Sequence, residues 1–141
     1  MYRSDRRLLP LFLLITLSCG GDDEPFSPTV QDVAGSYQAT SLTATQSGIT
    51  VNLLSLGATV AMVLNEDGTT TGRVFAPGLD EGGQDLDVDL AGTWTLQGET
   101  VTFDQTGDTF IRDIPFTASP NRLQGEGTFE SVTIRLTLTR E

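Results

Sequence analysis

Apolar and polar residues alternate most regularly along residues 85–97. The apolar or glycine positions of this stretch fall on every second residue: Leu86, Val88, Leu90, Gly92, Trp94 and Leu96. Because successive side chains of a β-strand point to opposite faces, this period of two predicts one long strand with a buried face and a solvent-facing one. Glycine packs little and marks bends, so Gly92 is the expected position of a bend.

Segments with alternating apolar and polar residues recur from Val30 to the end of the chain. Turn residues separate them roughly every eight to twelve positions, which is typical of all-β domains. The Asp67-Gly68 pair predicts a tight hairpin. The predicted strands are 33–45, 58–65, 69–76, 85–97, 100–104, 108–117, 122–126 and 131–140. Eight antiparallel strands joined in order predict an up-and-down barrel.

One connection breaks the alternation. Residues 46–57 contain the run Asn52-Leu53-Leu54-Ser55-Leu56 followed by Gly57, which suits a short helical turn with a glycine cap. We expect this segment to form a lid-like connection.

The first residues carry a different pattern. Arg3, Arg6 and Arg7 precede the apolar run Leu8–Leu17, which is too short to span a bilayer and has the layout of a secretory signal. Cys19, the single cysteine of the chain, follows directly. We therefore expect a signal peptide over residues 1–18.

The residues Thr16-Leu17-Ser18-Cys19 resemble the lipobox of bacterial lipoproteins, with Thr16 where that motif usually has leucine. The resemblance implies cleavage before Cys19, acylation of its thiol and anchoring to the outer membrane, on the periplasmic or the surface side. Residues 19–29 would form a flexible acidic tether. Its Asp22-Asp23-Glu24 cluster fits either a surface-export signal or a plain solvated linker.

Composition excludes several classes of function. The net charge of −11 becomes −13 when residues 1–18 are removed with three arginines and one aspartate, which disfavours nucleic acid and anionic lipid headgroups as partners. The chain contains no lysine and no histidine. The usual general base and the commonest metal ligand are thus missing, so we expect a non-enzymatic protein without a cofactor.

Two short motifs resemble those of the lipocalins and related calycin barrels. That family begins with Gly-x-Trp on the first strand and ends with a basic residue on the last, and this chain has Gly35-Ser36-Tyr37 and Arg140. The resemblance implies a lipocalin-like barrel over residues 30–141. It also implies that Arg140, on the inner face with Val132, Ile134, Leu136 and Leu138, packs across Tyr37 and closes one end.

Clustered carboxylates allow two interpretations. Asp85, Asp87 and Asp89 share one strand face and could offer oxygens to calcium, but their spacing is wide for a single ion, and a solvated outer face explains them as well. We assign no metal site. The acids fall on predicted turns and outer faces, which also argues against a glycosidase.

A set of inward-facing apolar side chains could line a ligand cavity or simply fill the core. These candidates are Tyr37, Met62, Val74, Trp94, Phe103, Phe110 and Phe116. Small residues at the inward or bend positions Ala39, Gly72 and Gly92 would leave room and favour a cavity. Two functions remain open: a monomeric, membrane-anchored module that binds a small apolar ligand, or an envelope protein with a filled barrel that meets another protein.

Overall fold

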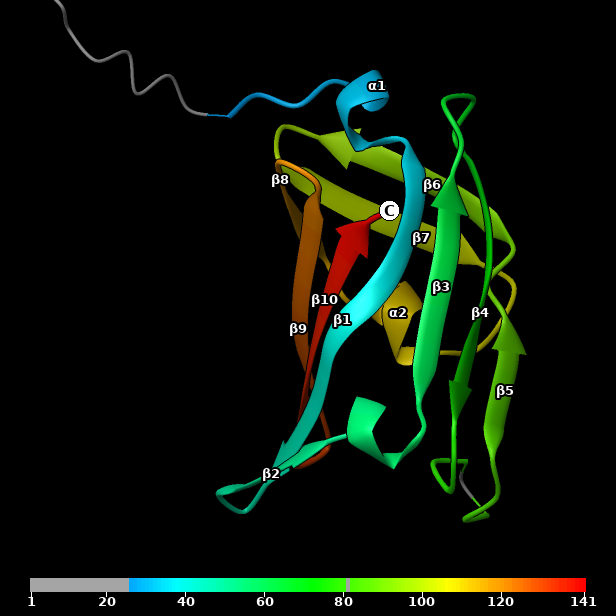
Figure 1. The fold of residues 1–141 in the computed structure, drawn as a ribbon, viewed down its shortest axis with the longest axis vertical. Coiled ribbons are helices and arrows are strands. Elements are labelled where there is room, and N and C mark those ends of the chain that lie inside the picture. Colours follow the sequence, from blue (N-terminus) through cyan, green and yellow to red (C-terminus); the bar gives the residue numbers. More distant parts are fainter. Residues whose placement is uncertain (1–25, 81) are drawn as a thin grey trace, which may run out of the picture.

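The first and last strands of the sheet pair with each other and close it into a barrel (Figure 1). This computed structural model describes residues 26–80 and 82–141. The barrel strands are β1 (Gly35–Gln46), β3 (Thr59–Leu64), β4 (Thr69–Ala76), β6 (Gly92–Gln97), β7 (Thr100–Gln105), β8 (Phe116–Ser119), β9 (Arg122–Phe129) and β10 (Val132–Arg140). All neighbours are antiparallel, which confirms the predicted eight-stranded up-and-down barrel.

Five shorter elements accompany the barrel strands: α1 (Val30–Val33), β2 (Ile49–Asn52), the 3₁₀ turn η1 (Leu54–Leu56), β5 (Leu86–Asp89) and α2 (Phe110–Asp113). One edge of β1 pairs with β10, while its other edge is shared by β3 near its start and β2 near its end. The predicted helical turn before Gly57 is confirmed, and Gly57 adopts a left-handed φ of 101° as its cap.

The predicted strand over residues 85–97 is wrong as a single element. It divides into β5 and β6 around Leu90 and Ala91, and both pieces pair with the same edge of β4. Between them the backbone N–H of Leu90 donates to the carbonyl of Gly72 at 2.9 Å. The alternation nevertheless holds across the break, since Leu90 and Trp94 are both buried.

The predicted strand over residues 108–117 is also corrected. Its first half forms the helical turn α2, and β8 begins only at Phe116. Ile111 and Ile114, three residues apart as on one helix face, are fully buried, and Arg112 pairs with Asp108 one turn earlier at 2.7 Å. Burial on one face of a turn therefore outweighs the strand preference of this β-branched segment.

Apolar side chains pack the interior of the barrel. Phe103 and Phe116 pack edge to face with ring centroids 5.4 Å apart, at an interplanar angle of 81°. The side chains with no exposed surface include Leu42, Val60, Val74, Leu123 and Leu138. These side chains form a packed core.

The two ends of the barrel differ. In Figure 1, α1 lies over the upper end, whereas the β1–β2 hairpin, η1 and the loop after β4 surround the lower end. Phe26, in the predicted tether, packs half-buried against the core. The signal segment 1–18, Cys19 and the acidic cluster 22–24 lie outside the described residues.

Two glycines allow neighbouring strands to approach each other closely. A Cβ at Gly72 would overlap the Ala61 carbonyl oxygen, and one at Gly92 would overlap the Asp104 carbonyl oxygen. Neighbouring backbone therefore occupies the place where a side chain would begin at these two positions, and the expectation that they leave room for a ligand stays a prediction.

Replacing Gly92 with alanine should destabilise the fold by about 3 kcal/mol, since the methyl group can be accommodated only by moving the backbone of β7. Urea unfolding would measure the change. Gly98→Ala is the matched control: its φ of 61° is strained for alanine but nothing lies within 4 Å of the new methyl. That variant should lose only about 1 kcal/mol, and equal losses in the two variants would contradict the close contact.

Candidate functional site: an apolar cavity at the barrel mouth

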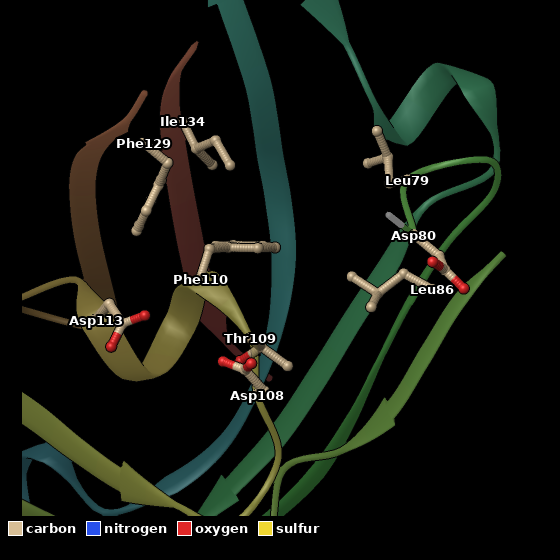
Figure 2. A pocket seen from close by; sticks show the side chains of 9 residues that line it. All are labelled: Leu79, Asp80, Leu86, Asp108, Thr109, Phe110, Asp113, Phe129 and Ile134. Carbon is tan, nitrogen blue, oxygen red and sulfur yellow. The ribbon is translucent and has the colours of Figure 1, made fainter. Parts of the chain in front are cut away.

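A cavity of about 570 Å³ opens at the end of the barrel opposite α1. Its apolar wall comes from five elements or loops. These side chains are Leu79 in the loop after β4, Leu86 of β5, Phe110 of α2, Phe129 of β9 and Ile134 of β10. Figure 2 shows Phe129 and Ile134 across the space from Leu79 and Leu86, with Phe110 between the two groups. A space of this size and lining suits a small apolar molecule.

A second apolar hollow of about 420 Å³ shares Leu79 with the first. Its wall includes Ile49 and Val51 of β2 and Leu56 of η1. Ile49 is 69% exposed, Leu56 61%, Leu79 46% and Val51 40%. Large apolar side chains are seldom this exposed together on a monomer surface unless they bind something.

Carboxylates border the larger cavity on opposite sides, with Asp113 across the space from Asp80 in Figure 2. Asp80, Asp108 and Asp113 contribute to its lining. Arg112 lies 2.7 Å from Asp108 and 3.5 Å from Asp113, so two of the three carboxylates share a single positive charge. These four side chains together therefore keep a net negative charge.

A buried hydroxyl lies next to Asp108 in the chain. Thr109 lines the cavity, is only 5% exposed, and its Oγ1 has no hydrogen-bond partner. Threonine at this position before α2 would ordinarily cap the helix, but its side chain makes no capping bond. An unpaired buried hydroxyl costs free energy unless a partner reaches it. Gln105, at the end of β7, is likewise buried with both amide atoms unpaired.

The opposite end is closed by Tyr37 and Arg140. These residues are direct partners in the β1–β10 register, and the Arg140 guanidinium carbon lies 5.7 Å from the Tyr37 ring centroid. Arg140 Nη2 donates to the carbonyl of Asp32, and the Tyr37 hydroxyl donates to that of Val33 at 2.5 Å. Both strands are thereby tied to α1, whose capping box joins Thr29 and Asp32.

The structure distributes the predicted ligand-binding residues over three places. Phe110 lines the mouth cavity, while Tyr37 and Met62 touch a smaller hollow of about 280 Å³ beside Gly72. Val74, Trp94, Phe103 and Phe116 lie in the packed core, each at most 5% exposed. The Trp94 ring also donates from Nε1 to the Asn65 carbonyl at 2.9 Å. Contact of these seven residues with a ligand stays a prediction.

Sequence reasoning missed most of the mouth cavity. Leu86 and Ile134 stood on predicted inner faces, so alternation carried a signal for them. Alternation gave no such signal for Leu79, which lies in a glycine-rich loop. It also gave none for Phe129, which ends β9, because that strand was predicted too short. Thr109 was missed because α2 was taken for a strand.

The aspartates of residues 85–89 are spread along the outside of the barrel. Arg73 forms an ion pair with Asp87 at 2.5 Å, and this hydrogen-bonded partner lowers the pKa of the Asp87 carboxyl. Within residues 26–80 and 82–141, no group of three or more potential metal ligands gathers in one place. No helix in the same residues is long and apolar enough to cross a membrane.

Comparisons with known proteins give no family assignment. No protein-family model matches the chain, and no curated protein matches its sequence. The functional argument therefore rests on the barrel and its cavity.

The closed end predicts an alkaline limit to stability. Burial raises the pKa of the Tyr37 phenol above its usual 10, against the opposing pull of Arg140. A group whose pKa is raised by folding contributes its full stability below the unfolded value and loses that contribution as pH rises through the folded value. We expect unfolding free energy to begin falling near pH 10, as measured by denaturant titrations at increasing pH.

The tyrosine absorbance of Tyr2→Phe, in which Tyr37 is the one remaining tyrosine, should titrate above pH 10. Tyr37→Phe should remove the added alkaline slope of stability and cost about 1 kcal/mol through the lost hydrogen bond to Val33. A normal titration midpoint in Tyr2→Phe would contradict the buried, closed end.

Proposed function

We propose that the protein is a non-enzymatic, lipid-anchored binding module that takes a small apolar ligand into the mouth of a lipocalin-like barrel. The observation that carries the proposal is the asymmetry of the interior: one end is packed with side chains, while the other holds a cavity of about 570 Å³ with an apolar wall. The volume lies in the usual range for small-molecule sites.

The proposed anchor rests on the lipobox-like residues and the order of elements. Acylated Cys19 would hold the chain at the outer membrane, and residues 19–29 would lead into α1. Since α1 lies over the closed end, the membrane attachment joins the barrel opposite its mouth (Figure 1). The mouth would then be free to receive a ligand from the aqueous side.

A second candidate is supported by the exposed rim. Ile49, Leu56 and Leu79 are each more than two-fifths exposed and border the second hollow. A surface of this kind also fits contact with another protein of the envelope, with the barrel acting as a scaffold.

Leu79→Ser should weaken binding of a neutral solvatochromic dye such as Nile red about fivefold. The reason is that the dye would no longer cover the exposed half of the Leu79 side chain. Fluorescence titration of the purified protein measures the dissociation constant. Val30→Ser is the matched control, because Val30 is 39% exposed but lies on α1 at the closed end. Its affinity should match that of the parent protein.

The absence of saturable dye binding by the parent protein would overturn the ligand-binding proposal. The protein-contact candidate makes a different prediction: Ile49→Ser and Leu56→Ser would release an envelope partner and leave the dye affinity intact.

A further inference from the structure

We infer that the protein forms a two-fold dimer in which strand β2 of one copy pairs antiparallel with β2 of a second copy. The dimer would continue the sheet of one barrel into the next at the lower end in Figure 1, where the β1–β2 hairpin projects. It differs from the monomer expected from the sequence. It does not depend on the proposed binding of a ligand, because β2 is not among the elements that line the cavity of Figure 2.

One edge of β2 is open. Within the described part of the chain, β2 pairs with β1 alone, and all four of its residues are exposed. The backbone N–H of Leu53 donates to the carbonyl of Leu42 on β1 at 2.8 Å. Because alternate residues of an antiparallel strand bond to the same neighbour, Ile49 and Val51 also bond toward β1, and the N–H and C=O of Thr50 point to the open edge. A second strand can therefore pair there without displacing β1.

The edge of β2 lacks the protection that another open strand carries. Among the described residues β5 pairs with β4 alone, but β5 contains Asp87 and Asp89, and Asp85 precedes it. Charged side chains on an edge strand discourage pairing with another chain. The residues of β2 are Ile-Thr-Val-Asn, with no charge and no proline, and the first three are β-branched. The β2 edge therefore remains able to pair.

The distribution of charge favours a second copy as the partner. No charged residue occurs from Val33 to Asn65, and all 19 acidic residues of the chain lie outside that stretch. Two copies repel each other wherever their acidic surfaces meet, so the neutral segment that contains β2 is where they can approach. A basic partner would instead bind the acidic parts of the surface.

The sequence of β2 also matches itself in the antiparallel direction. With the two-fold axis between the two Thr50 residues, each Thr50 N–H donates to the Thr50 carbonyl of the other copy. In this register Ile49 of each copy lies opposite Val51 of the other. These two side chains share one face of β2 and are 69% and 40% exposed in the single chain. Pairing therefore covers four apolar side chains that are otherwise in water.

Disulfide cross-linking tests the register. In a Cys19→Ser background, Thr50→Cys should give a covalent dimer under mild oxidation, because directly opposed residues bring their Cα atoms within reach of a disulfide. Ile49→Cys and Val51→Cys should each cross-link poorly alone and well when the two variants are mixed. Equal cross-linking of all three single variants, or none for Thr50→Cys, would overturn the two-fold pairing.

Sedimentation equilibrium of the purified full chain measures the strength of the dimer. We expect a dissociation constant of about 10 µM at physiological salt, since one short strand pair makes a small interface. Higher salt should tighten the dimer, because screening weakens the repulsion between two acidic copies. A chain that stays monomeric at about 1 mM would overturn the inference.

A pair of charge variants locates the interface. Ile49→Asp should raise the dissociation constant about tenfold or more, because it places two carboxylates at the paired edge. Val30→Asp is the matched control: Val30 is 39% exposed on α1 at the other end of the barrel, so the added charge should leave the constant within about twofold. Equal effects of the two substitutions would mean general repulsion between copies, and would overturn the pairing of β2.

A pair of variants at Thr50 separates edge pairing from folding. Thr50→Pro removes the outward N–H and should abolish the dimer, since proline is tolerated on an edge strand but cannot donate. Thr50→Val loses the same hydroxyl contact with Thr45, keeps the N–H, and should still dimerise. Urea unfolding of both variants checks that they fold. A dimer that survives both Ile49→Asp and Thr50→Pro would contradict the inference.

Discussion

The structure depends on the pairing of β1 with β10. The two strands are almost a hundred residues apart in the chain, yet they pair from Tyr37 with Arg140 to Gln46 with Val132. This pairing joins the first and last strands of the barrel, so that neither is left as an open edge where β-proteins aggregate. Closure also encloses an interior. The contacts of Tyr37 and Arg140 with the carbonyls of α1 determine which end of that interior is sealed. The cavity at the other end follows from the same closure.

The contrast between the two ends reflects the lengths of the strands. β1, β9 and β10 run the full height of the barrel, whereas β8 has only four residues and α2 stands where a longer strand would continue. The short turn of α2 inserts Ile111 and Ile114 into the core but leaves Phe110 and Thr109 at the cavity. A hollow bounded by a helical turn, a loop and three strands is thus built into the fold. Its acids lie on the turn and the loop, where water reaches them, and its apolar side chains lie mainly on strands.

Alternation in the sequence predicted the barrel because strand faces obey a strict period of two, and it correctly placed Leu86, Leu90, Trp94 and Leu136 toward the interior. It failed where tertiary contacts override the local pattern. The spacing of Ile111 and Ile114 was a helical signal, but β-branched residues and Pro115 made the segment look like the end of a strand. Gly72 and Gly92 looked like open space because residue spacing does not show how closely the backbone of the adjacent hairpin strand approaches them. Leu79 carries no periodic signal at all, so its place at the cavity is known only from the folded chain.

The central claim is that one end of the barrel is solid and the other can receive a ligand. The most direct measurement is a titration of isotopically labelled protein with Nile red, followed by amide and methyl NMR shifts. The account predicts that saturable shifts centre on Leu79, Leu86, Phe110, Phe129 and Ile134, with the resonances of Tyr37, Met62 and Trp94 unmoved. Shifts centred on the closed end, or spread over the outer wall without saturation, would contradict it.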